Sequence, residues 1–374
     1  MTLHLRAATT ALAMLVFAAP AAAAAPNAPA CAGARATIVG TRGDDVIRAT
    51  RDADVIAARG GDDVVLGFGG NDRLCGGPGD DELRGGADRD RVLGGRGGDI
   101  VRGGGGSDVL AGDAGDDVVR GGPRAGDTVT YRRAAAGVVV DLAAGTATGQ
   151  GTDLLAGISS VEGSDHDDVV RGDGGANWFD GNRGADVLRG RAGYDSLRGG
   201  PGGDVLDVGE DGDRADGGAG ADRLTGGGSS DGLVGGRGAD HIRGLAGSDV
   251  MRPGPGDDVV DGGDGTDSLD FLYGPVVADL AAGIAAGEGD DVLIAVESLG
   301  GTDQDDVLAG DDGSNRLLGE GGDDVLRGRG GDDYLNGDHD PAFDGPDGTD
   351  ELDGGDGVDH CVKGEVYTGC EPAP

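Results

Sequence analysis

Apolar side chains recur every nine residues along most of the chain, and the first run of them extends from Ile47 to Val119. Two residues before each of them stands an Asp, from Asp45 to Asp117. A short, strict period predicts a solenoid, because each repeat unit buries its apolar side chain only by stacking on its neighbours. We call each nine-residue unit a row, in which the Asp occupies position 6 and the apolar residue position 8.

Rows fill residues 40–120, 163–270, 301–336 and 345–362, which makes 27 rows and about two-thirds of the chain. Position 6 is Asp in 25 rows and Asn in the other two, at Asn177 and Asn315. This regularity predicts the following division of the chain: repeat block 1 (40–120), a spacer (121–162), repeat block 2 (163–270), a second spacer (271–300), and repeat block 3 (301–362) with an insertion at 337–344.

The two spacers are related to each other. They contain VVVDLAAGTATG (138–149) and VVADLAAGIAAG (276–287), and residues 141–181 match 279–319 at a constant offset of 138. A module of spacer plus rows is therefore duplicated. The Val-rich runs predict further strands, so that the spacers continue the coil with longer loops.

Within a row, glycines at positions 1, 2 and 4 permit positive φ and a tight turn. Positions 7–9 form a short strand whose middle side chain points inward. Two rows make one turn of the coil, and strands of successive turns stack in parallel about 4.8 Å apart. Position 6 of one row then lies against position 6 of the row two later, as in Asp45 beside Asp63.

Stacked carboxylates require a counter-charge. At about 5 Å they repel by ~1 kcal/mol per pair in water and ~3 kcal/mol at an effective dielectric constant of 20. A divalent cation between them turns the repulsion into cohesion, and hard oxygen ligands favour Ca²⁺, whereas the chain has no His or thiolate cluster for zinc. A merely solvated acidic face predicts scattered acids, not a nine-residue register.

The predicted metal ligands are the Asp residues at position 6 of rows with intact turns. Rows in which Asp52 or Asp88 replaces the position-4 Gly, and the row 208–216, are not expected to bind calcium. Because each ion would lie between rows n and n+2, we predict on the order of ten to twenty Ca²⁺ per chain. The predicted ligands are Asp45, Asp63, Asp72, Asp81, Asp99, Asp108, Asp117, Asp168, Asp186, Asp195, Asp204, Asp222, Asp231, Asp240, Asp249, Asp258, Asp267, Asp306, Asp324 and Asp333.

Rows such as GTRGDDVIR (40–48) and GEGGDDVLR (319–327) resemble the RTX (repeats-in-toxin, haemolysin-type) nonapeptide GGxGxDxUx. The resemblance implies an all-β, right-handed parallel β-roll (β-helix solenoid) with Ca²⁺ held between turns by position-6 carboxylates and loop carbonyls. It implies no single activity. The chain differs from many RTX proteins in its N-terminal signal and in leaving no room for an effector domain.

Charge and the N-terminal segment bear on partners and localisation. The net charge of −40 disfavours nucleic-acid binding, which needs a basic surface. Residues 1–25 predict a cleaved secretory signal peptide, with a charged start, an apolar stretch and an Ala-rich cleavage region. No membrane span is expected after its removal. We therefore predict a secreted, extracellular protein.

Four Cys residues allow three pairings, and an exported chain is expected to oxidise them. We favour Cys31–Cys75, which would tie an N-terminal cap (26–39) to the first coils, and Cys361–Cys370 next to a C-terminal cap (363–374). Cys361 and Cys370 fall on facing strands, and sheets about 10 Å apart exceed the ~7 Å that a disulfide tolerates. The two sheets must therefore come closer together, or become irregular, at the last turn.

The leading functional hypothesis is a secreted calcium-binding repeat protein without catalytic activity, which folds on Ca²⁺ and serves as an extracellular structural or interaction module. Its candidate partners besides calcium ions are cell-wall, matrix and host-surface components. The alternatives are an RTX-type membrane-lytic toxin, for which no inserting segment is visible, and the calcium-binding part of a secreted hydrolase. The GxSxG-like pattern around Ser230 lies inside a repeat row, where an ordinary turn explains it.

Overall fold

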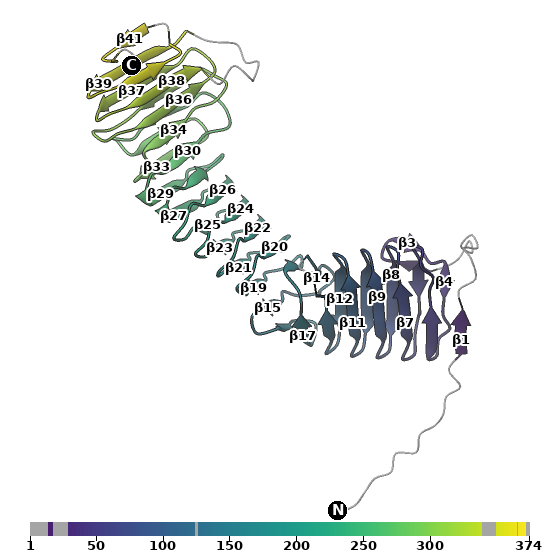
Figure 1. Ribbon diagram of the computed structural model, residues 1–374. Helices are drawn as coiled ribbons and strands as arrows, with labels where there is room; N and C mark the ends of the chain where they lie inside the picture. Colours follow the sequence, from purple (N-terminus) through teal and green to yellow (C-terminus); the bar gives the residue numbers. More distant parts are fainter. Residues whose placement is uncertain (1–13, 18–28, 124–125, 339–348, 365, 372–374) are drawn as a thin grey trace, which may run out of the picture. The chain divides into compact units, whose positions relative to one another are not determined.

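The computed structural model describes residues 14–17, 29–123, 126–338, 349–364 and 366–371. It divides into two compact units, Met1–Ser164 (unit 1) and Asp165–Pro374 (unit 2). Every regular element in these residues is a β-strand (Figure 1). The predicted all-β solenoid is confirmed.

Unit 1 contains two stacks of parallel strands. The chain alternates between them, so strands that follow each other in sequence lie on opposite faces. The first stack, sheet 1, is β5 (Asp45–Arg48), β7 (Val64–Phe68), β9 (Glu82–Ala87), β11 (Ile100–Gly105), β13 (Val118–Arg120) and β17 (Thr152–Ala156). The second, sheet 2, is β4 (Ile38–Val39), β6 (Val55–Ala57), β8 (Arg73–Pro78), β10 (Arg91–Arg96), β12 (Val109–Ala114), β14 (Thr128–Thr130) and β18 (Ser160–Glu162).

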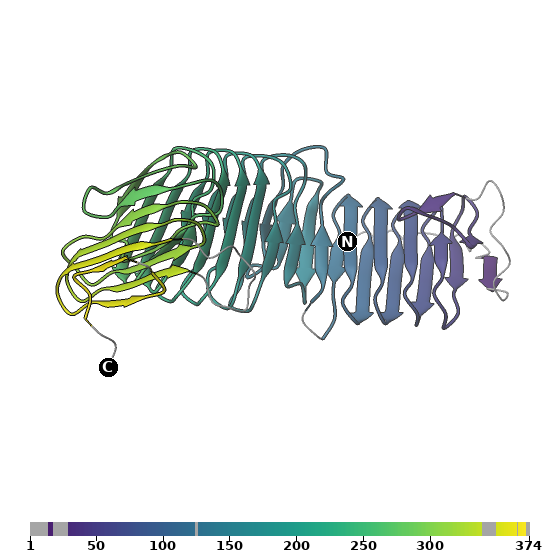
Figure 2. The same cartoon turned by 90° about the horizontal axis from the view of Figure 1, so that it is seen from above.

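Unit 2 repeats this arrangement (Figure 2). Its sheet 1 is, in spatial order, β19 (Val169–Arg171), β21 (Val187–Arg189), β23 (Val205–Asp207), β25 (Arg223–Thr225), β27 (His241–Gly247), β29 (Val259–Gly265), β33 (Asp290–Ile294), β32 (Ile284–Ala286), β31 (Val277–Asp279), β35 (Val307–Ala309), β37 (Val325–Gly330), β39 (Glu351–Asp356) and β41 (Val366–Thr368). Its sheet 2 is β20 (Trp178–Asp180), β22 (Ser196–Pro201), β24 (Arg214–Ala219), β26 (Gly232–Arg237), β28 (Val250–Arg252), β30 (Ser268–Asp270), β34 (Ser298–Gly300), β36 (Arg316–Glu320), β38 (Tyr334–Asp338) and β40 (His360–Val362).

The strand register confirms two rows per turn. Ile47 pairs with Val65 and Val65 with Leu83, each 18 residues apart. These position-8 side chains fill the space between the sheets and are completely buried. The core is therefore a single row of mostly aliphatic side chains from each sheet, with Phe179 as a buried aromatic exception, which explains how a chain with 3% aromatic residues builds it.

The row glycines serve two purposes. Positions 2 and 4 lie in the left-handed region, as in Gly77 (φ 125°) and Gly79 (φ 136°). Asp88, which replaces the position-4 glycine of its row, takes the same conformation (φ 74°), so the turn persists there. Position 1 does not have positive φ, and its glycine is required for a different reason, given below.

Each spacer places an antiparallel strand in sheet 1, whereas its strands in sheet 2 continue the parallel stack. In unit 2, β33 pairs with β29, β32 lies antiparallel between β33 and β31, and β31 pairs with β35. In sheet 2, β30 and β34 are direct neighbours across the same spacer. In unit 1, β15 (Val139–Asp141) and β16 (Thr146–Thr148) form the corresponding antiparallel pairings next to β17.

Both favoured disulfides are present. Cys31 bonds Cys75 and ties the hairpin of β2 (Ala30–Cys31) and β3 (Ala34–Arg35) to β8. Cys361 bonds Cys370, and their Cα atoms are 5.8 Å apart, so the chain does come together at this end. Most of the predicted signal (1–25) and of the insertion (337–344) lies outside the described residues; β1 (Met14–Phe17), within the signal, pairs with β5.

Candidate metal centre

The position-6 Asp side chains, except the half-buried Asp54, are buried at the junction between each loop (row positions 1–6) and the strand that follows it. All twenty predicted ligands, from Asp45 to Asp333, have relative exposures of 4% or less. A buried carboxylate without compensation is costly. The contacts of its two oxygens therefore decide what this site can do.

The first oxygen, Oδ1, accepts a backbone hydrogen bond from the row two earlier. The amide of Asp63 donates to Asp81 Oδ1 at 2.8 Å, and the amide of Asp81 donates to Asp99 Oδ1 at 2.8 Å. The same bond recurs in unit 2, for example from Asp222 to Asp240 Oδ1 at 2.8 Å. We call each stack of Asp side chains linked in this way, 18 residues apart, an Asp ladder.

The second oxygen, Oδ2, has no hydrogen-bond partner in most mid-block rows, as at Asp81, Asp99 and Asp240, whereas Asp231 Oδ2 accepts the amide of Gly227 at 2.7 Å. It lies against the position-1 glycine of its own row. A Cβ atom on Gly76 would overlap Asp81 Oδ2 and lie 2.7 Å from the carbonyl oxygen of Gly94, one turn later. A carboxylate oxygen and a carbonyl oxygen thus converge on one space that only glycine leaves open.

The electrostatics of the ladder favour a positive charge. Burial raises the pKa of Asp81, Asp90 and Asp99 to about 7, the amide hydrogen bond lowers it, and neighbouring carboxylates raise it again. In unit 2 the pKa of Asp186 and Asp258 is raised to about 7 for the same reasons. The charged form is therefore destabilised unless a proton or a cation neutralises it.

These donors fit Ca²⁺. Within the described ranges, no three His, Cys, Asp or Glu side chains converge on one point. A cation would therefore be held by Asp Oδ2 together with loop carbonyls such as that of Gly94. Carboxylate and carbonyl oxygens in flexible loops are the ligands that Ca²⁺ prefers. The bound ion would supply the positive charge that the buried carboxylates lack.

The ladders also include acids that the sequence reasoning left out. Asp90 and Asp213 are buried and accept the same amide bonds, from Asp72 at 2.9 Å and Asp195 at 2.6 Å, although their rows have altered turns. In the spacers, Asp127 and Asp291 accept bonds from Asp108 at 2.8 Å and Asp258 at 3.0 Å. The signal that could have found them is an acid two residues before a buried apolar side chain, here Val129 and Leu293.

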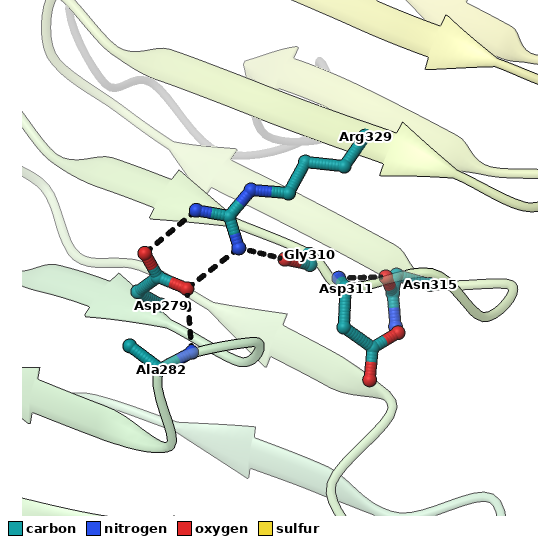
Figure 3. Close-up of polar contacts among 6 residues, drawn as sticks. All are labelled: Asp279, Ala282, Gly310, Asp311, Asn315 and Arg329. Atoms are coloured by element: carbon teal, nitrogen blue, oxygen red, sulfur yellow. Dashed lines mark hydrogen bonds and ion pairs between the residues drawn. The ribbon is translucent and has the colours of Figure 1, made fainter.

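Two rows depart from the ladder at position 6. Asn315 accepts the amide of Asp311 through Oδ1 at 2.8 Å. Close by, Arg329 reaches from the row two later to the carbonyl oxygen of Gly310 (2.7 Å) and forms a two-pronged ion pair with Asp279 (2.7 Å) (Figure 3). In this row the neutral amide of Asn315 replaces the position-6 carboxylate of mid-block rows. The guanidinium of Arg329 binds the loop carbonyl of Gly310.

Comparison with known proteins points to one repeat family. The model of the RTX calcium-binding nonapeptide repeat matches residues 35–65, 66–101, 93–123, 162–197, 198–233, 225–260, 234–269 and 300–338. These matches span more than half of the chain and leave out most of both spacers. No curated protein matches the chain. In the portion that the structure describes, no helix has the length and apolarity to cross a membrane.

Proposed function

Because the chain belongs to the RTX calcium-binding nonapeptide repeat family, we propose that it is a secreted protein that folds on binding multiple Ca²⁺ ions and acts as an extracellular structural or interaction module. Calcium binding itself follows from the family. Secretion, the absence of catalysis and the role as a module are the proposal.

The observation that carries the proposal is the ladder of buried Oδ2 atoms without donors, each facing a loop carbonyl. Without cations, each turn adds two more buried, destabilised carboxylates to a core built of one position-8 side chain per row. With cations, the same carboxylates link successive turns. Metal binding and folding are therefore coupled, and each ion orders the loop that the next ion needs.

Secretion agrees with this chemistry. Extracellular calcium modules typically bind with Kd ~10⁻⁴–10⁻³ M, a range suited to the calcium level outside cells. The two disulfides fit an oxidising environment. The chain would stay largely unfolded where calcium is scarce, which suits export, and would fold outside.

The direct test is far-UV circular dichroism of the mature chain in a chelator and then with millimolar calcium, followed by isothermal titration. We expect a disordered spectrum to become β-rich and on the order of ten to twenty ions to bind cooperatively. A spectrum that is already fully ordered in chelator and unchanged by calcium would contradict the proposal, as would one or two independent ions per chain. Magnesium at the same concentration is the control, because it demands a more rigid octahedral site.

A further inference from the structure

The first rows of a repeat block differ from later rows at position 2. Thr41 and Thr50 occupy it in block 1 and Thr302 in block 3, whereas glycine is common there in later rows. The hydroxyl of Thr41 donates to Asp45 Oδ2 at 3.0 Å, and that of Thr50 to Asp54 Oδ2 at 2.7 Å. The backbone amides of both Thr residues donate to the same oxygens, at 2.5 and 2.8 Å.

The same arrangement begins block 3. The amide of Thr302 donates to Asp306 Oδ2 at 2.5 Å, and its hydroxyl lies 3.2 Å from that oxygen and 2.9 Å from the carbonyl oxygen of Gly274. The carboxylate oxygen that has no donor in mid-block rows such as those of Asp81 and Asp99 is thus satisfied within its own row. In these rows a donor inside the row therefore occupies the carboxylate oxygen that a cation would otherwise bind.

The second row of block 3 reaches the same result by other means. Asn315 carries no charge, its Nδ2 lies 3.4 Å from the carbonyl oxygen of Glu297, and its backbone amide donates to Asp333 Oδ1 at 2.8 Å. Arg329 supplies a positive charge and ties its own row to Gly310 and to Asp279, the last residue of β31. After Asp279 the chain turns back into β32, so no repeat loop lies there to complete a calcium site.

The duplicated module contains the same pair. Asn177 accepts the amide of Asp173 at 3.0 Å, and Arg191, 138 residues before Arg329, donates to the carbonyl oxygen of Gly172 at 2.5 Å. Arg191 and Arg329 both hold positive φ, 82° and 76°, which is unfavourable for a residue with a side chain. Only one other row has Arg at position 2, Arg59. Other position-2 side chains, such as Phe68, Leu245 and Glu320, also have positive φ, so the observation that points to the pair is the recurrence of an Arg that binds the loop carbonyl of both Asn rows.

We infer that protein groups take the place of calcium in the starting rows of the repeat blocks: Thr41, Thr50 and Thr302 bind the carboxylates of Asp45, Asp54 and Asp306, and an Asn–Arg pair acts at Asn177/Arg191 and Asn315/Arg329. Asp45 and Asp306, which the sequence pattern predicts as calcium ligands, are then held by Thr donors. The inference rests on the proposed function, because it names the rows that the ions leave out. Each of these rows can fold without calcium and then serves as a seed, meaning a folded row on which the calcium-dependent rows stack. No ion lies between the rows 310–318 and 328–336.

The first test measures residual structure in the full-length chain without calcium. Hydrogen exchange in chelator, followed by mass spectrometry, should show peptides from 301–333 exchanging more slowly than mid-block peptides such as 217–243. Arg329→Gln should accelerate exchange in 301–333 by about tenfold, since it removes charge-assisted hydrogen bonds. Arg327→Gln, which removes an equal charge from β37 but leaves the Asn–Arg pair intact, is the matched control. Equal exchange rates in Arg329→Gln and wild type would overturn the inference.

The second test counts ions by native mass spectrometry at saturating calcium. The double variant Asn315→Asp/Arg329→Gly restores the consensus at both positions and should bind one ion more than wild type. Asn315→Asp alone should bind the wild-type number, because Arg329 then neutralises the new carboxylate. An unchanged count in the double variant would overturn the inference.

The two proposals fail in different ways. A wild-type chain that binds no calcium would contradict the proposed function. A different result would contradict only the inference about the starting rows. In that case the wild-type chain binds calcium cooperatively, but in chelator the amides of its starting rows exchange as fast as those of mid-block rows.

Discussion

At the scale of single residues, the two oxygens of each ladder carboxylate have separate roles. Oδ1 is fixed by a backbone amide from the preceding turn, as between Asp81 and Asp99, and Oδ2 faces a loop carbonyl. The amide bond positions the carboxylate before any ion arrives. The position-1 glycine then keeps open the space that the ion needs.

Asp99→Asn should therefore separate hydrogen bonding from charge. The amide side chain can still accept the bond from Asp81, but it removes the negative charge from the sites on either side of this row. We expect about two fewer ions per chain and a several-fold higher calcium midpoint for folding. Native mass spectrometry and circular dichroism measure the two effects. Asp207→Asn, which removes an outward-facing charge from β23, should change neither.

Gly94→Ala tests the space at position 1. A Cβ atom there would overlap Asp99 Oδ2 and lie 2.7 Å from Gly112 O. We expect destabilisation of the calcium-loaded protein by about 1–3 kcal/mol, as for other overpacked sites. Gly105→Ala is the control, because its nearest neighbour is 4.0 Å away. Equal urea midpoints for the two variants would show that position 1 does not limit the site.

At the scale of elements, the spacers extend the ladder without a regular row. In unit 1, Asp153 replaces a row Asp and accepts the amide of Asp117 at 3.2 Å. Its Oδ2 accepts the hydroxyl of Tyr131, which is also buried, at 3.1 Å. Burial, followed by the charge of Asp153, raises the Tyr131 pKa far above its ordinary value, so the phenol stays protonated and donates.

Tyr131→Phe should leave that buried carboxylate oxygen without its donor. The expected loss is about 1–3 kcal/mol of unfolding free energy in the calcium-loaded protein. Tyr194→Phe, at a side chain that is 74% exposed, should cost nothing measurable. Chemical denaturation followed by circular dichroism compares the two. A neutral Tyr131→Phe would mean that water or an ion serves Asp153 instead.

The two disulfides should differ in their effect on stability. Cys31–Cys75 closes a loop of 44 residues and Cys361–Cys370 one of 9. Loop-closure entropy predicts losses of about 4 and about 2.6 kcal/mol when each pair is replaced by Ser. Thermal unfolding in saturating calcium should therefore show the larger decrease for Cys31→Ser/Cys75→Ser. The reverse order would mean that the C-terminal end limits stability.

At the scale of the whole molecule, many raised carboxyl pKa values act together. Ladder groups such as Asp72, Asp195 and Asp324 have pKa values of about 7, against 3.8 for an ordinary Asp. The folded, metal-free chain therefore binds more protons than the unfolded chain between about pH 4 and pH 7. Its stability is largest below the lower pKa and is lost as the pH rises through the higher one.

In chelator, the chain should therefore be more ordered at pH 5 than at pH 8. In calcium the dependence should reverse, because protons compete with the ion, and the calcium midpoint should rise as the pH falls below about 6–7. Circular dichroism across this pH range, with and without calcium, measures both trends. A metal-free chain that becomes more disordered on acidification from pH 8 to pH 5 would contradict the reasoning.

The sequence by itself determined the solenoid, the 18-residue register, the inward position-8 side chains and the oxygen chemistry of the ladder, because a strict period fixes neighbours without any knowledge of distant contacts. Only the tertiary structure showed that the amide of Asp63 holds Asp81 Oδ1, that position 1 must be glycine to admit Oδ2, and that β32 runs antiparallel between β31 and β33. Contacts such as that of Arg329 with Asp279, 50 residues apart, interrupt the period and join a row to a strand of the spacer. Repetition makes the regular rows predictable from their neighbours alone, whereas the exceptions depend on which distant residues the spacers bring together.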